Sequence, residues 1–199
     1  MLNELNELSR VTDVTDIPDF AKVSELQEFA PSMEIQAQEI RDIFYEIPEL
    51  SYDRWKELSI DRRAELLGYF ETKIAAIEMR NPLRIEHEAT AKSVAGYFNG
   101  SKIVISDNQL GRNDIGAYWD VLDTLFHEGR HAYQFHNIYG TRTERSDELF
   151  KSWEVNMKEM GYQPGNSYTT IGLNRYFCQP VEVDARVFAE LAIKAIRST

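Results

Sequence analysis

The residues best suited to chemistry form the motif His127-Glu128-Gly129-Arg130-His131. Two histidines four positions apart lie on one face of a helix, one turn apart, so both imidazoles can reach a single metal ion. A tetrahedral zinc ion suits this pair, and Glu128 can accept the proton of a water molecule on the zinc. The motif therefore predicts a zinc hydrolase with Glu128 as its general base.

The surrounding sequence predicts an amphipathic helix from Asp120 to Gly140. One face of the helical projection carries the two motif histidines, and the opposite face carries an apolar stripe with helical spacing: Tyr118, Leu122, Leu125, Phe126, Ala132 and Tyr133. His136 falls on the apolar side, and we interpret it as a core or interface histidine and not as a ligand. Gly129 lies in the middle of this side, where we expect another backbone element to approach closely.

A catalytic zinc site needs a third protein ligand and an open position. Apart from His136, no histidine follows the motif, so the candidates are acids in the helix expected to start at Pro180. Glu182 lies in the first turn of that helix. Asp184 lies about 200° further round an ideal helix, so the two carboxylates cannot both face one ion. The apolar pattern alone does not choose between them.

The pattern of these two helices resembles that of the gluzincin clan of zinc metallopeptidases. The segment Glu182-Val183-Asp184-Ala185-Arg186-Val187-Phe188-Ala189 follows the last motif histidine by about fifty residues. The chain is most similar to compact members, namely the ImmA/IrrE-type peptidases and the metallopeptidase domains of bacterial polymorphic toxins. The resemblance extends over about Ala95 to Ile196. It implies a zincin-like fold in a bacterial or phage protein and the hydrolysis of a protein or peptide substrate.

The resemblance also assigns roles to residues. It implies that His127, His131 and Glu182 bind zinc and that Glu128 is the catalytic base. The chain departs from the family pattern in two places. Arg130 stands where many relatives have glycine, and Arg186 stands four residues after Glu182, where larger gluzincins have an aspartate. Asp184 is then expected to orient a histidine or a neighbouring arginine.

A peptidase also needs a group that stabilises the oxyanion of the transition state. We favour Tyr176 as this catalytic residue because it closely precedes the helix that carries Glu182. The other candidates are Tyr168, Arg175, Arg186 and His87. Cys178, the only cysteine, could cap the metal as a thiolate, but we expect it to be a small buried hydrophobic residue.

The elements that must position these residues are mostly helical. Apolar periodicity predicts three further helices, over 34–46, 59–80 and 146–161, and a loop over 163–174. Alternating residues over 83–87 predict a strand, and segments 93–98 and 102–106 flank Asn99-Gly100, which is a strong hairpin signal. The predicted class is α+β, mainly helical with a small antiparallel hairpin or sheet beside the HExxH helix.

The charge is concentrated at one end of the chain. Of a net −11, the first fifty residues hold −9, with twelve acidic and three basic side chains. We therefore divide the chain into an acidic, partly helical segment, 1–50, and a zincin-like metallopeptidase domain, 51–199. The acidic segment could occupy the cleft and keep the enzyme latent, or it could bind a basic protein partner or aid solubility. We expect no nucleic-acid partner, because phosphate binding needs a basic face.

The sequence contains no apolar run of the length that a membrane span requires and no basic start followed by an apolar stretch. We expect no membrane association and a location that is cytoplasmic or reached without a signal peptide. Two alternative functions stay open. The metal site could staple a catalytically degenerate binding or regulatory module, or it could hydrolyse a small amide substrate.

Overall fold

The computed structural model of the protein describes residues 28–163 and 170–198. Within these residues the elements run in the following order: α1 (Met33–Glu46), the 3-10 turn η3 (Pro48–Leu50), α2 (Tyr52–Trp55), α3 (Ile60–Ile77), β1 (Arg84–Glu88), β2 (Gly96–Phe98), β3 (Lys102–Ser106), α4 (Asp107–Leu110), α5 (Ile115–Tyr139), α6 (Asp147–Glu154), the π-helix η4 (Val155–Met160), α7 (Thr170–Phe177) and α8 (Pro180–Arg197). The predicted class, α+β and mainly helical, is confirmed.

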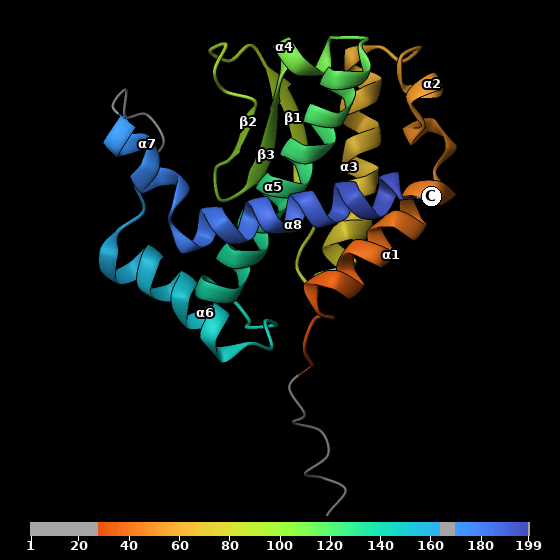
Figure 1. Ribbon diagram of the computed structural model, residues 1–199. Coiled ribbons are helices and arrows are strands. Elements are labelled where there is room, and N and C mark those ends of the chain that lie inside the picture. Colours follow the sequence, from red (N-terminus) through yellow and green to blue (C-terminus); the bar gives the residue numbers. More distant parts are fainter. Residues whose placement is uncertain (1–27, 164–169, 199) are drawn as a thin grey trace, which may run out of the picture.

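Helix α5 occupies the centre of the molecule. The sheet lies on one side of it and α3 on another, while α8 crosses it and packs against α1 at its far end (Figure 1). The rings of Phe70 on α3 and Phe126 on α5 meet edge to face, with centroids 6.0 Å apart, inside the main hydrophobic core. Phe188 and Ala192 of α8 enter the same core. The helix that carries the motif is thus fixed on several sides by buried apolar contacts.

The helix boundaries follow local capping chemistry. The carboxylate of Asp114 accepts a hydrogen bond from the backbone N–H of Ala117 and caps α5, which starts at Ile115, five residues before the predicted Asp120. The hydroxyls of Ser59 and Ser146 cap α3 and α6 in the same way, as their sequence positions predicted. Pro180 opens α8, where a missing backbone N–H has no cost.

The sheet has three strands in the order β1-β3-β2. Strands β2 and β3 form the predicted antiparallel hairpin about Asn99-Gly100, with Tyr97 opposite Val104. Strand β1 pairs with β3 in parallel, so the sheet is mixed and not purely antiparallel. The chain reverses its direction between β1 and β2 and again in the hairpin between β2 and β3, so β1 and β3 run in the same direction. Because β3 lies in the middle of the sheet, β2 is an edge strand.

The predicted loop over 163–174 is wrong in its last part, because α7 begins at Thr170. Gly172 and Asn174 are weak helix formers, so the sequence pattern did not predict this short helix. Residues 164–169 lie outside the described part of the chain.

The predicted acidic segment is described only from residue 28 onward. Its helix α1 buries Ile40 and Phe44, and Ile47 and Leu50 are buried just after this helix, all in the main core. Residues 28–50 therefore share a core with the remainder of the protein. Residues 1–27 lie outside the described residues, so the proposed latency, partner-binding and solubility roles of the acidic segment stay predictions. No helix in the described part of the chain has the length and apolar character needed to cross a membrane.

Candidate metal centre and its cleft

The two motif histidines and Glu182 come together where α8 crosses α5. The Nε2 atoms of His127 and His131 lie 3.1 Å apart. Glu182 Oε2 lies 3.4 Å from His127 Nε2, and Glu182 Oε1 lies 3.3 Å from His131 Nε2. Among the described residues, this is the group of three donors that could hold a metal ion. Of the two candidate acids in α8, Glu182 is the one whose carboxylate points at the histidines, and Asp184 is not.

Glu182 is fully buried, and its two oxygens have different surroundings. Oε1 accepts a hydrogen bond of 2.7 Å from the hydroxyl of Tyr162. Oε2 is buried and has no hydrogen-bond partner in the protein. An unpartnered buried carboxylate oxygen is costly, and a cation shared with the two imidazoles would satisfy it. The residues therefore fit a bound metal ion.

The electrostatics of the group favour positive charge. Burial by itself raises the pKa of Glu182, but the adjacent imidazoles of His127 and His131 outweigh it and leave the pKa well below the ordinary value. Burial lowers the pKa of His131, yet the adjacent Glu182 carboxylate and the charge of Glu128 raise the pKa overall. A site that stabilises an imidazolium also stabilises a metal cation, which competes with the proton for the same nitrogen.

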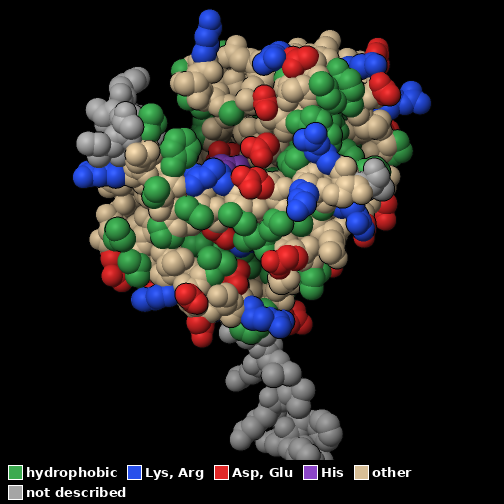
Figure 2. Space-filling model, in the orientation of Figure 1, with side chains coloured by type: hydrophobic (Ala, Val, Ile, Leu, Met, Phe, Trp, Pro, Cys, Tyr) green, Lys and Arg blue, Asp and Glu red, His purple; other side chains and the backbone are tan. Residues whose placement is uncertain are grey.

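Glu128 lies in a cleft between α5 and the edge strand. The cleft has a volume of about 430 Å³, and its walls include Glu128, His131 and the backbone of β2. Figure 2 shows the hollow on the face crossed by α8, with histidine at its floor and acidic side chains around its opening. The backbone N–H of Phe98, on the side of β2 that faces away from β3, donates a 2.8 Å hydrogen bond to Glu128 Oε2. The base and the free strand edge thus face the same space.

Gly96 allows this close contact between β2 and α5. A Cβ atom at this position would lie 2.5 Å from the carbonyl oxygen of Val104 and 2.7 Å from Thr124 Cγ2. Neither neighbour can move far, because one is backbone of the central strand and the other is a β-branched side chain on α5. The glycine therefore sets the distance between the strand edge and the motif helix.

Two tyrosines cover the centre. Tyr176, the predicted oxyanion residue, lines the cleft, and so does Tyr162, which no sequence pattern indicated. Their rings lie 6.4 Å apart in an edge-to-face arrangement. Burial, and then contact with Glu182, raises the pKa of both phenols, so both keep their protons at neutral pH. Tyr162 follows the π-helix η4, and no spacing rule links it to the motif.

The other predicted oxyanion candidates that the structure describes are not in the cleft wall. His87 lies between Asp107 and Asp61, at 2.7 and 3.0 Å, and belongs to a different part of the surface. Arg186 Nη1 is 4.0 Å from Glu182 Oε2, but its Nη2 donates to the carbonyl of Phe177.

Arg175 is exposed, and Tyr168 lies outside the described residues. Among the candidates that the structure describes, Tyr176 is the cleft-lining one.

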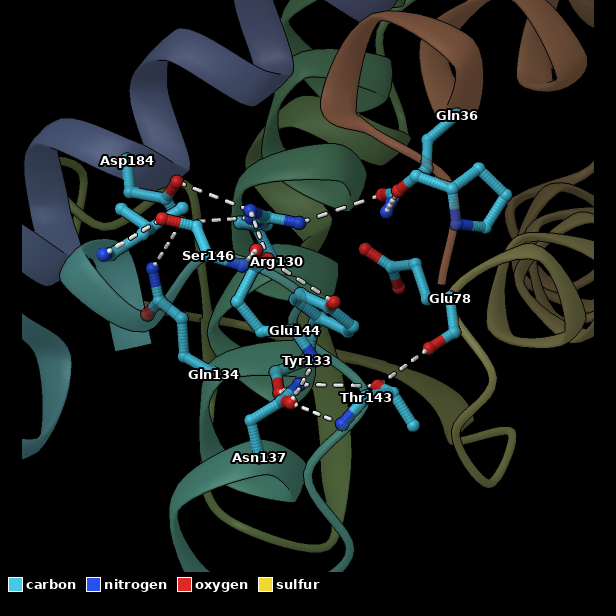
Figure 3. Close-up of polar contacts among 12 residues, drawn as sticks. Gln36, Glu78, Arg130, Tyr133, Gln134, Asn137, Thr143, Glu144, Ser146 and Asp184 are labelled. Atoms are coloured by element: carbon cyan, nitrogen blue, oxygen red, sulfur yellow. Dashed lines mark hydrogen bonds and ion pairs between the residues drawn. The ribbon is translucent and has the colours of Figure 1, made fainter. Parts of the chain in front are cut away.

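Asp184 faces away from the metal donors and pairs with Arg130. The Arg130 Nε and Nη2 atoms lie 2.8 and 3.2 Å from the two carboxylate oxygens (Figure 3). Asp184 also accepts a hydrogen bond from Gln134, whose other end contacts His131. The expectation that Asp184 orients an arginine or a histidine matches this arrangement. The unusual Arg130 of the motif is thus a buried partner of the second helix.

Three expectations about single residues have clear outcomes. His136 lines a separate cavity with Arg80 and is not among the donors that could hold a metal ion, and burial and then Arg80 lower its pKa. The expected close backbone approach at Gly129 is wrong: the nearest neighbour of an added Cβ would be the Arg80 guanidinium, at an ordinary 3.6 Å. Cys178 is exposed, so its prediction as a buried residue is wrong too. It lies in the short link between α7 and α8, where neither helix covers it.

Comparison of the chain with protein-family models, with curated proteins and with solved structures finds no match.

Proposed function

We propose that the protein is a zinc-dependent endopeptidase of the gluzincin type. The observation that carries this proposal is the position of Glu128, which lines one cleft together with His131 and accepts a hydrogen bond from the free edge of β2. A metal site that only stabilises the fold has no use for a carboxylate in its open cleft. The resemblance of the two helical motifs to gluzincins agrees with the same assignment.

The separations of the donor atoms support zinc. A tetrahedral ion with ligand bonds of roughly 2.0–2.1 Å has ligands about 3.3 Å apart. The nitrogen–nitrogen distance of 3.1 Å and the two nitrogen–oxygen distances of 3.4 and 3.3 Å lie close to this value. Two imidazoles and one carboxylate are also the donor set of hydrolytic zinc sites, which keep a fourth position open. Copper or nickel would prefer a planar or tetragonal arrangement.

The residues of the cleft can then be given roles. When bound, zinc would polarise the scissile carbonyl and lower the pKa of water to about 7. Glu128 accepts the proton of the attacking water and later delivers it to the amine nitrogen as the C–N bond breaks. Tyr176 donates a hydrogen bond to the oxyanion. The outward-facing backbone groups of β2, apart from the Phe98 N–H that donates to Glu128, hold an extended peptide by strand addition.

The deciding experiment compares Glu128→Gln with the wild type on a mixture of unstructured peptides. We expect the variant to keep its zinc and its fold and to lose about 10²-fold or more in rate, because the base is gone while the ligands remain. Glu148→Gln is the matched control, since Glu148 is exposed on α6 and should leave the rate unchanged.

The other outcomes separate the alternatives. Zinc binding without any peptide cleavage by the wild type would favour a metal-stapled binding module. Cleavage confined to small amides would favour a hydrolase of small substrates. Unchanged turnover in Glu128→Gln would overturn the proposed mechanism.

A further inference from the structure

A buried amide links His131 to the second helix. Gln134, which is 3% exposed, lies one turn beyond His131 on α5. Its Oε1 is 2.9 Å from His131 Nδ1. Its Nε2 lies 2.9 Å from the carbonyl oxygen of Val181 and 2.8 Å from Asp184 Oδ2.

These contacts fix which end of the Gln134 amide faces the histidine. The amide nitrogen can only donate, and the amide oxygen can only accept. Val181 and Asp184 both offer acceptors, so the nitrogen must face them. A flipped amide would bring its oxygen against two acceptor oxygens and lose both hydrogen bonds. Oε1 is therefore directed at His131, and it requires a proton on Nδ1 of that ring.

Arg130 holds Asp184 in the acceptor position. Its guanidinium, which has only donors, contacts both carboxylate oxygens. The guanidinium is itself fixed by aromatic rings, with the ring centroids of Tyr133, Phe188 and Trp153 at 4.5, 5.0 and 5.2 Å from its central carbon. Arg130 and Asp184 are 1% and 5% exposed. Water therefore does not compete for these contacts.

We propose that Gln134, Asp184 and Arg130 are positioning residues that hold His131 as the Nδ1-protonated tautomer. The ring nitrogen that remains unprotonated is then Nε2, which is the atom that faces His127 and Glu182. The proposal rests on the metal site of the proposed function. The positioning residues come from both helices: Gln134 and Arg130 lie on α5, and Asp184 lies on α8 (Figure 3).

The first test is nitrogen-15 NMR of the histidine rings in the zinc-free protein. At a pH where the ring is neutral, wild-type His131 should be chiefly the Nδ1-protonated tautomer, and Gln134→Met should shift it toward a mixture because the acceptor is lost. The second readout is the dissociation constant for zinc, measured by competition with a chromophoric chelator. We expect Gln134→Met to weaken zinc binding by about 10- to 100-fold. In Asp184→Asn the side-chain amide of Gln134 is free to rotate by 180°, so both readouts should change in the same direction. This variant provides the test if Gln134→Met does not fold.

Asn137→Leu is the matched control. Asn137 is a buried amide on the same helix, but its partners are the backbone of Tyr133, Thr143 and Glu144 and not a metal ligand. This variant should lose stability and keep the tautomer and the zinc affinity. The proposal is overturned if Gln134→Met keeps the wild-type tautomer, or if Asn137→Leu weakens zinc binding as much. Neither readout involves peptide hydrolysis, so a protein that binds zinc without cleaving peptides would leave the positioning role intact.

Discussion

At the scale of residues, the two tyrosines that line the cleft should have different roles. The hydroxyl of Tyr162 donates a 2.7 Å hydrogen bond to an oxygen of the metal ligand Glu182, whereas Tyr176 is the proposed oxyanion donor. Tyr162→Phe should therefore weaken zinc binding by about 10-fold or more through the loss of a ligand's hydrogen bond. Tyr176→Phe should keep the zinc affinity and lower kcat by about 10²-fold, as for other oxyanion donors.

Zinc titration and steady-state kinetics of the two variants separate these effects. Tyr139→Phe is a suitable control, because Tyr139 is an exposed tyrosine near the end of α5 and has no contact with the donor group. If Tyr176→Phe lost zinc while Tyr162→Phe did not, the two assignments would have to be exchanged.

The residues that the sequence identified are those whose spacing is fixed by one helix. His127 and His131 are one turn apart in any helix, so their joint position needs no tertiary information. The apolar pattern could not rank Glu182 and Asp184, and it was the family resemblance that favoured Glu182. The crossing of α5 and α8 decides which side of α8 faces the histidines. Tyr162 had no local signal, since a π-helix and a turn place it beside Glu182.

At the scale of elements, Gly96 controls how closely β2 lies against α5. Gly96→Ala should destabilise the protein by about 1–3 kcal/mol, because the added methyl overlaps a backbone oxygen and a threonine methyl. It should also move β2 away from α5 and break the hydrogen bond between Phe98 and Glu128. Urea unfolding measures the first effect, and amide hydrogen exchange at Phe98 measures the second.

Gly68→Ala is the control for this substitution. Gly68 lies in the interior of α3, and an added Cβ there would meet its nearest neighbour at 3.9 Å. Alanine should stabilise the helix at this position by about 0.5–1 kcal/mol. Equal effects at the two glycines would show that the packing of β2 against α5 is not tight.

A second prediction at this scale concerns His87, which joins three elements. Its ring on β1 contacts Asp107 at the start of α4 and Asp61 at the start of α3. The hydrogen bond to Asp107 is the largest cause that raises the pKa of His87, and Asp61 adds to it, against a smaller effect of burial. Because the pKa is raised in the folded state, the stabilisation is complete below the unfolded value of about 6.5. It is lost as the pH rises through the folded pKa.

The expected result is a free energy of unfolding that falls across this pH range in the wild type and falls less in His87→Gln. The comparison is made on zinc-free protein, so that both forms carry the same titrating groups at the metal centre. Identical pH profiles in the two proteins would contradict the assignment.

The elements themselves show where local sequence suffices. Capping serines, the helix-opening proline and the Asn99-Gly100 turn act within a few residues, and the predicted helices and hairpin appear at these places. The parallel pairing of β1 with β3 could not be predicted in this way. A strand sequence does not specify which neighbour it joins, and here the choice depends on how β1 packs against α3 and α4.

At the scale of the whole molecule, metal binding and folding should be coupled. The donors come from α5 and α8, which are separated in sequence and pack against each other through the main core. An ion that binds this pair stabilises the folded chain and has little affinity for the unfolded one. At a free zinc concentration about 100 times the dissociation constant, the free energy of unfolding should rise by about 2.7 kcal/mol.

Urea unfolding in the presence of zinc and in the presence of EDTA measures this increment. The wild type should lose it when the metal is removed and regain it when zinc is restored. His131→Ala lacks one donor and should show little difference between the two conditions at the same zinc concentration. An equal increment in His131→Ala would place the stabilising zinc elsewhere on this acidic protein. If the zinc-dependent increment is lost only in the variant, the stability that zinc gives to the α5–α8 pair depends on the three donors His127, His131 and Glu182.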